Sequence, residues 1–253
     1  MSALPPKADI EQHDWRVSLG QRQQAFCNQF NSMNAPKITL IGGPTALIEI
    51  AGFRLLTDPT FDEPGEYKLP QVTLTKTSGP ALSLKQLGAV DAVLLSHDQH
   101  ADNLDNSGRA FLKQSSRVLT TTSGAERLGG SVEGLRPWQS VSLNKPDSSI
   151  TITATPARHG PAGVEPLTGD VIGFVLEDGS NEIYVTGDTV WYDGTAEVAR
   201  RYQPKLVIVF AGSAEPRGPF HVTMDSNDAI ETAHAFKGAA IVAIHNHGWA
   251  HFK

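Results

Sequence analysis

The stretch that decides the fold runs Ser96-His97-Asp98-Gln99-His100-Ala101-Asp102-Asn103-Leu104-Asp105, and it follows the apolar residues 90–95 without a break. A short apolar run rich in valine and leucine predicts a buried β-strand. Two imidazoles and three carboxylates therefore leave the end of one strand within a few residues. The strand fixes the backbone while the loop aims the side chains, so this density of polar groups indicates a binding site.

Three later segments each place one more polar residue just after a strand-like run. These residues are His159, Asp188 and His245. Imidazole nitrogen and carboxylate oxygen together suit zinc, iron or manganese as ligands. We therefore predict a metal centre whose ligands come from distant parts of the chain: His97, His100, Asp102, His159, Asp188 and His245.

Composition indicates a soluble globular protein of one large or two small domains. The 253 residues are 40% hydrophobic and carry a formal net charge of −6, which disfavours a nucleic-acid partner because such partners select basic surfaces. The single cysteine, Cys27, permits no internal disulfide. No apolar run is long enough to span a membrane, and the first residues lack a signal-peptide pattern, so we expect a cytoplasmic protein.

The pattern from Lys37 onward predicts many strands and few helices. Strands are expected at 37–41, 45–50, 53–57, 90–95, 117–121, 150–155, 171–176, 182–186, 206–210 and 239–244. Ala51-Gly52 and residues 177–181 are expected to close two hairpins. Helices are expected at 83–87, 195–202 and 225–236, the last with apolar residues at helical spacing (Ala229, Ile230, Ala233 and Phe236). Strands from both halves of the chain suggest two sheets covered by helices.

Residues 1–36 differ from the rest, since they are rich in glutamine and show no sustained apolar period. We expect a loose or disordered leader there. An alternative is that translation starts at Met33, which would make the leader an over-extended start. The domain proper is then expected to span residues 37–253.

The order of these motifs resembles the metallo-β-lactamase-fold hydrolase superfamily, in which a His-x-His-x-Asp-His cluster is followed by a lone histidine, an aspartate and a final histidine. The chain is most similar to the branch with ascorbate-phosphate lactonases and phospholipase-D-like hydrolases of N-acyl phosphatidylethanolamines. Matching stretches cover nearly everything from Lys37 onward: LTDPT at 56–60, the cluster at 95–105, TPARHG at 155–160, TGDTVWY at 186–192 and HNHGWAHF at 245–252. The resemblance implies an α+β fold, an αββα sandwich of two mixed sheets covered by helices.

The resemblance also implies how the ligands divide. His97, His100 and His159 would hold one divalent metal; Asp102 and His245 would hold a second, with Asp188 bridging. One or two ions are expected, zinc first, with manganese or iron as alternatives. A metal-bound hydroxide would attack the substrate, with Asp102 as the catalytic proton acceptor. Asp58 would orient a ligand imidazole from outside the ligand shell.

The chain departs from the family at several positions. Two residues rather than one separate His97 from His100, so either Gln99 or His100 takes the second ligand position. Asn103 stands where the family has its third histidine, which leaves the second site one imidazole short. The chain also stops at Lys253, soon after the final histidine, and the family usually continues into a helix, so we expect a truncated C-terminus.

Four further residues are candidates near the site. Asp105 is expected to support it from outside the ligand shell or to act as a helix N-terminal acid. His247 is a rival to His245 for the last ligand position. His221 is expected either to line the pocket or to cap a loop. His251 is expected either to line the pocket or to pack.

These observations predict a metal-dependent hydrolase of an ester, lactone or phosphodiester bond in a small molecule, with a homo-oligomer as a further possibility. One alternative is a nuclease or other phosphodiesterase of the same fold. Another is a degenerate, non-catalytic metal-binding member, suggested by Gln99, Asn103 and the short C-terminus.

Overall fold

The computed structural model describes residues 35–68, 72–216 and 218–253, and Pro36–Lys253 form one compact unit. The predictions for the leader, including the alternative start at Met33, fall almost entirely outside the described residues. Among the described residues, no helix is long and apolar enough to cross a bilayer.

The first sheet of this unit is mixed. Its strands, in sheet order, are β1 (Lys37–Gly42), β2 (Thr45–Ile50), β3 (Phe53–Thr57), β6 (Ala92–Leu94), β7 (Val118–Thr121) and β8 (Val132–Leu135). The first three form an antiparallel meander, and β3, β6, β7 and β8 run parallel. Ala51 and Gly52 both have positive φ (49° and 79°), which confirms the predicted two-residue hairpin turn.

The second sheet is also mixed. In sheet order it contains β14 (Ala240–Ile244), β13 (Leu206–Phe210), β12 (Glu182–Val185), β11 (Ile172–Glu177), β10 (Ser148–Pro156) and β9 (Ser140–Lys145). The strands β9 to β12 alternate in direction, whereas β12, β13 and β14 are parallel. A small separate hairpin joins β4 (Gly65–Lys68) and β5 (Thr73–Lys76).

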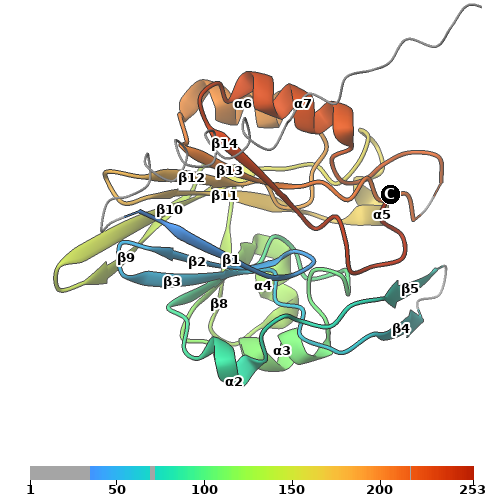
Figure 1. The fold of residues 1–253 in the computed structure, drawn as a ribbon, viewed down its shortest axis with the longest axis horizontal. Helices are drawn as coiled ribbons and strands as arrows, with labels where there is room; N and C mark the ends of the chain where they lie inside the picture. Colours follow the sequence, from blue (N-terminus) through green and yellow to red (C-terminus); the bar gives the residue numbers. More distant parts are fainter. Residues whose placement is uncertain (1–34, 69–71, 217) are drawn as a thin grey trace, which may run out of the picture. The chain divides into compact units, whose positions relative to one another are not determined.

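The two sheets face each other, and helices cover their outer faces (Figure 1). The largest apolar cluster lies between the sheets and includes Phe53, Phe174 and Phe210. The helices α2 (Leu84–Leu87), α3 (Asn106–Leu112) and α4 (Thr122–Leu128) lie on the first sheet; α6 (Asp193–Arg201) and α7 (Ser226–Ala235) lie on the second. This arrangement confirms the predicted αββα sandwich.

The helix α7 does not use the face that its apolar residues suggest. Ile230 is 52% exposed and Ala233 is also exposed, whereas Thr232 and Phe236 are buried. Thr232 can be buried because its hydroxyl donates to the carbonyl oxygen of Asp228 at 2.8 Å, which satisfies its polar atom within the helix.

Candidate metal centre

The predicted ligands meet because of strand direction. The strands β10, β12 and β14 run the same way, since β10 and β12 each pair antiparallel with β11, and β12 to β14 are parallel. His159, Asp188 and His245 follow these three strands, and therefore lie at one edge of the second sheet. The loop after β6 of the facing sheet brings His97 and His100 to the same place.

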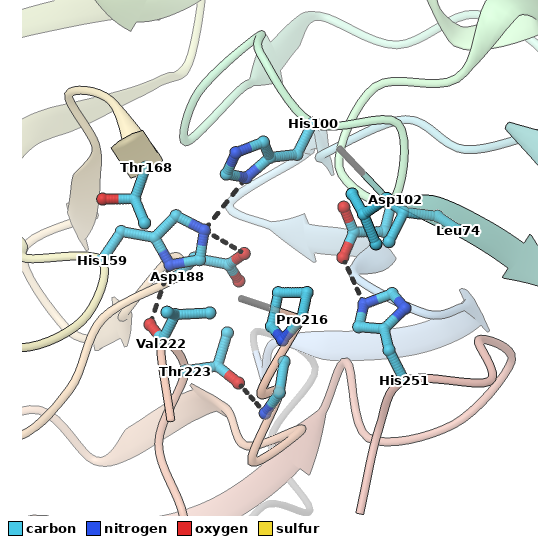
Figure 2. A pocket seen from close by; sticks show the side chains of 12 residues that line it. Leu74, His100, Asp102, His159, Thr168, Asp188, Pro216, Val222, Thr223 and His251 are labelled. Atoms are coloured by element: carbon cyan, nitrogen blue, oxygen red, sulfur yellow. Dashed lines mark hydrogen bonds and ion pairs between the residues drawn. The ribbon is translucent and has the colours of Figure 1, made fainter. Parts of the chain in front are cut away.

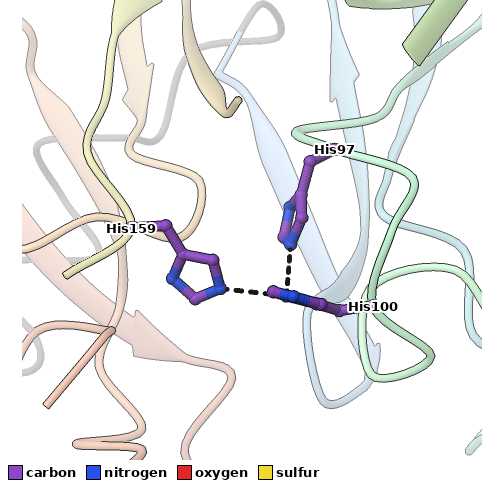
Figure 3. Close-up of side chains that lie close together, drawn as sticks. All are labelled: His97, His100 and His159. Atoms are coloured by element: carbon purple, nitrogen blue, oxygen red, sulfur yellow. Dashed lines mark hydrogen bonds between the residues drawn. The ribbon is translucent and has the colours of Figure 1, made fainter. Parts of the chain in front are cut away.

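Three imidazoles form a compact group, shown in Figure 3. His100 Nδ1 lies 2.9 Å from His97 Nε2 and 3.0 Å from His159 Nε2. One ring nitrogen from each residue lies within 4.8 Å of those of the other two, which is close enough to share one metal ion. His97 and His159 are buried and His100 is half-buried.

Two of these imidazoles are held in a defined orientation by their second ring nitrogen. His159 Nδ1 lies 2.8 Å from the carbonyl oxygen of Val222, an acceptor, so Nδ1 carries the proton and Nε2 keeps its lone pair. The hydroxyl of Ser96 lies 3.0 Å from His97 Nδ1 and donates to Asp58 Oδ1 at 2.7 Å. Asp58 therefore orients His97 through Ser96, a residue that the sequence interpretation did not single out.

Of the two residues proposed for the second ligand position, the structure brings His100 to the group and not Gln99. The side chain of Gln99 is exposed and rests on Gly169, where a Cβ atom would lie 2.1 Å from its Nε2. The extra residue in the cluster is thus turned outward, while His100 reaches the group through Nδ1, the ring nitrogen nearer its backbone.

A second group of side chains continues from the first through Asp188 (Figure 2). Asp188 Oδ2 lies 3.6 Å from His159 Nε2, and its other oxygen, Oδ1, lies 3.3 Å from His245 Nε2. Asp102 Oδ2 lies 3.8 Å from His245 Nε2 and 3.0 Å from His251 Nε2. The carboxylate of Asp188 therefore presents one oxygen to each side of the centre.

Burial and neighbouring charges shift the pKa values of this group strongly. Burial lowers the pKa of His97, and the adjacent imidazoles of His100 and His159 lower it further, so His97 is neutral and able to bind a metal. Burial alone would raise the pKa of Asp102, but the hydrogen bond from His251 and the nearby imidazoles bring it below its ordinary value. Asp188 is likewise kept ionised, against the effect of burial, chiefly by His245.

The residues present fit a divalent cation. Apart from the 3.3 Å contact between Asp188 Oδ1 and His245 Nε2, these two atoms and His245 Nδ1 are buried without a hydrogen-bond partner among the described residues, which is uncommon for buried polar atoms. Ligands at about 2.0–2.2 Å from a tetrahedral zinc ion lie roughly 3.3–3.6 Å apart. The separations of 2.9–3.8 Å between neighbouring donor atoms here are of that size.

The centre lies in the wall of an open cavity. His100, Asp102, His159, Asp188 and His251 supply its polar wall. The rest of the lining is mostly apolar and consists of Val72, Leu74, Ala214, Pro216 and Val222, with Thr168 and Thr223. No lysine or arginine lines this cavity among the residues that the structure describes.

Other predicted residues lie away from the cavity. Asp105 caps α3 by accepting from the backbone amide of Gly108 at 2.8 Å, and it forms a buried ion pair with Lys76 at 2.9 Å. Its role as a helix N-terminal acid is therefore confirmed, and it contacts none of the predicted ligands.

Two further histidines also face elsewhere. His221 turns toward α7, where its Nε2 lies 3.0 Å from Asp228 Oδ2. His247 is exposed, and its Nδ1 lies 3.0 Å from Asn246 Oδ1, so the structure brings His245 and not His247 to the centre. Asn103 is buried, and neither atom of its amide has a hydrogen-bond partner among the described residues.

The sequence profile of the beta-lactamase superfamily domain matches residues 53–246, which include every predicted ligand. The chain belongs to this superfamily. The protein YddR of the UPF0173 group from Bacillus subtilis is 28% identical over 217 residues, covering 82% of this chain and 84% of that protein. A UPF0173 metal-dependent hydrolase from Carboxydothermus hydrogenoformans is 23% identical over 216 residues, covering 84% and 85%.

Solved structures share the fold. The isothiocyanate hydrolase from Delia radicum gut bacteria superposes with a TM-score of 0.71 at 25% sequence identity, covering 82% of this chain and 84% of that one. The possible metal-dependent hydrolase from Veillonella parvula superposes with a TM-score of 0.70 at 24% identity. These likenesses agree with the αββα sandwich described above.

Proposed function

We propose that the chain cleaves an ester or lactone bond of a small, largely apolar molecule at the centre formed by His97, His100 and His159. It is a metal-dependent hydrolase of the metallo-β-lactamase fold, as its superfamily and its relatives indicate. The observation that carries the proposal is the approach of three imidazole nitrogens to one another beside Asp188, in the wall of an open cavity.

The three histidines and Asp188 would hold the first metal ion, and Asp102, Asp188 and His245 would hold a second. When bound, such an ion polarises the attacked group and lowers the pKa of coordinated water toward about 7. Asp102 is kept ionised by the imidazoles around it, so its carboxylate can accept a hydrogen bond from the attacking water and orient it. Asp58, acting through Ser96, and the carbonyl of Val222 keep two ligand imidazoles in place.

The wall of the cavity favours an uncharged acyl substrate over a nucleic acid. Its five apolar residues would bind the body of a small molecule, whereas a polyanion would meet Asp102 and Asp188 with no lysine or arginine among the described lining residues. The net charge of −6 opposes a nuclease in the same way. Zinc is the metal that we propose, because a mixed imidazole and carboxylate set suits it.

An isothiocyanate is a second candidate substrate. The solved isothiocyanate hydrolase from Delia radicum gut bacteria resembles this chain in fold and at 25% sequence identity. Water attack on the central carbon of an N=C=S group makes the same demands on the site as attack on a carbonyl, namely an activated water and a place for developing negative charge.

The test is hydrolysis of four probes by zinc-loaded protein: p-nitrophenyl acetate, an aliphatic γ-lactone, bis(p-nitrophenyl) phosphate and phenethyl isothiocyanate. We expect turnover of the ester or the lactone, its loss on chelation, and its loss in His159→Ala but not in the matched surface variant His247→Ala. Preferred cleavage of the phosphodiester would favour the alternative function, that of a phosphodiesterase. A folded protein that takes up no metal and hydrolyses none of the probes would be a non-catalytic member, and the proposal would be wrong.

A further inference from the structure

The second side of the centre, around the carboxylates of Asp102 and Asp188, has one imidazole among the predicted ligands, that of His245. The structure supplies an imidazole at this side from a different segment. His251 Nε2 lies 3.0 Å from Asp102 Oδ2, closer than any other imidazole contact of that carboxylate among the described residues. We propose that His251 is a ligand of the second metal ion, beside Asp102, Asp188 and His245; this inference rests on the metal-dependent function proposed above.

Backbone hydrogen bonds fix the segment that carries His251. The amide of Thr77 donates to the carbonyl oxygen of Gly248 at 2.8 Å, and the amide of Ala250 donates to that of Thr75 at 2.9 Å. Lys76 and Trp249 form an antiparallel bridge between these two bonds. Residues 248–250 therefore lie alongside β5 as a short added strand, and His251 follows at its end.

Aromatic packing then limits the rotation of the imidazole. The ring of Phe252 lies 4.6 Å from that of His251 and 4.7 Å from that of His245, measured between ring centres. Phe252 thus contacts both imidazoles at the second side of the centre. Gly212 permits this packing, because a Cβ atom there would lie 2.8 Å from the ring of Phe252.

The orientation of His251 is that of a ligand rather than of a histidine that only packs. Its Nε2 faces the carboxylate of Asp102, one of the predicted ligands, and the residue lines the cavity. The neighbouring His247, from the same turn of chain, faces outward and contacts Asn246. Asp188, His245, Asp102 and His251 are linked in a row by contacts of 3.3, 3.8 and 3.0 Å, so a four-donor set is available once the side chains close on an ion.

The first test compares the metal content of wild type, His251→Ala and His247→Ala after dialysis against zinc. We expect His251→Ala to lose the second equivalent and to bind it roughly 100-fold or more weakly, beyond the 10–100-fold typical of losing an outer-shell partner. The first equivalent should keep its affinity in a chelator competition, and His247→Ala should match wild type. Equal affinity of wild type and His251→Ala for both equivalents would overturn the proposal, as would a wild type that binds one equivalent only.

A second variant tests ligation directly and does not depend on activity. In cobalt-substituted His251→Cys, a thiolate ligand gives a sulfur-to-cobalt charge-transfer band in the near ultraviolet, and the wild type, which has Cys27 alone, supplies the background. Appearance of the band supports ligation at this position; a folded, two-cobalt protein without it would contradict the proposal. Failure of the proposed function would look different, because metal uptake would then be absent at the three-histidine group as well.

Discussion

At the scale of single residues, the cluster 96–105 accommodates two residues between His97 and His100 because the two histidines present different ring nitrogens to the centre. His97 and His159 present Nε2, whereas His100 presents Nδ1. The intervening Gln99 points outward against Gly169, so its presence between the two histidines removes no ligand side chain from the centre. A motif search that requires one residue between the histidines would miss this arrangement.

Ser96 is the residue that transmits the orientation from Asp58 to His97. In Ser96→Ala, His97 loses the contact at 3.0 Å that holds its Nδ1, so we expect metal affinity to fall about 10–100-fold. The free energy of unfolding should fall by about 1 kcal/mol, because one buried hydrogen bond to Asp58 is lost. Chelator competition and chemical denaturation measure these effects, with the exposed Ser116→Ala as control. Unchanged affinity in Ser96→Ala would show that His97 is held by other contacts.

At the scale of elements, the turn after β12 places Asp188 by means of one glycine. Gly187 has φ of 63°, and a Cβ atom there would lie 2.6 Å from the carbonyl oxygen of Ile172. The backbone of this turn therefore approaches β11 so closely that a side chain cannot be accommodated without a shift. The position of the Asp188 carboxylate depends on that approach.

We accordingly expect Gly187→Ala to lower both stability and metal affinity. Gly179 is a matched control, since its φ of 86° carries the same backbone penalty but a Cβ atom there would meet nothing within 4 Å. Gly187→Ala should lose about 1–3 kcal/mol more in the free energy of unfolding than Gly179→Ala, because it adds overpacking to the backbone cost. Equal losses in the two variants, measured by urea denaturation, would mean that the turn relaxes freely.

Asp62 joins the β4–β5 hairpin region to the start of α3, and it gives the structure a pH dependence away from the centre. Its carboxylate accepts from the hydroxyl of Tyr67 at 2.8 Å and from the amide of Ser107 at 2.9 Å. Burial opposes ionisation, but these hydrogen bonds outweigh it and lower the pKa of Asp62 from 3.8.

A folded pKa below the unfolded one stabilises the protein above the unfolded value, and the effect disappears as pH falls through the folded value. The difference in the free energy of unfolding between wild type and Asp62→Ala should therefore be constant from neutral pH to about pH 5 and shrink below about pH 4. Asp147→Ala, at an exposed hairpin turn, should show no such change. A difference independent of pH would contradict the role of the ionised carboxylate.

At the scale of the whole molecule, ligands from both sheets meet in one centre, so metal should hold the two halves of the sandwich together. Binding to the folded state alone adds about 2.7 kcal/mol at a free concentration of 100 Kd. We expect the Tm to rise with zinc and to fall on chelation, and His159→Ala to show little of this response. If the Tm of the wild type does not change with zinc, the centre does not bind zinc in the folded protein.

The sequence predicts the core of this fold well and its periphery poorly. Strands such as β6 and β13 are short, continuous apolar runs that are buried on both faces, and their length and valine content identify them as strands. The strands β8 and β9 alternate weakly and lie at or near a sheet edge, and α3 and α4 are helices of seven residues with glycine inside, so local pattern does not identify them. Edge and surface elements are decided by tertiary contacts rather than by their own residues.

The predicted ligands follow the same division. Residues that end buried strands, such as Asp188 and His245, could be placed from sequence because strand direction brings them to one edge. For His251 the sequence left pocket lining and packing open, since its position depends on the pairing of residues 248–250 with β5, far earlier in the chain. Asp105 lies close to Asp98 and Asp102 in the sequence, but its carboxylate caps α3 and forms an ion pair with Lys76. The ion pair is seen only in the three-dimensional structure.

The two oxygens of Asp188 have a thermodynamic consequence. Each faces a different side of the centre, so an ion that draws on one oxygen changes the charge available at the other. By reciprocity, whatever the first ion does to the affinity of the second, the second does to the first by the same factor. Binding of the two ions should therefore be coupled, so the binding curve of the whole centre should differ from that of either site alone. The metal concentration would then set the fraction of molecules that hold both ions.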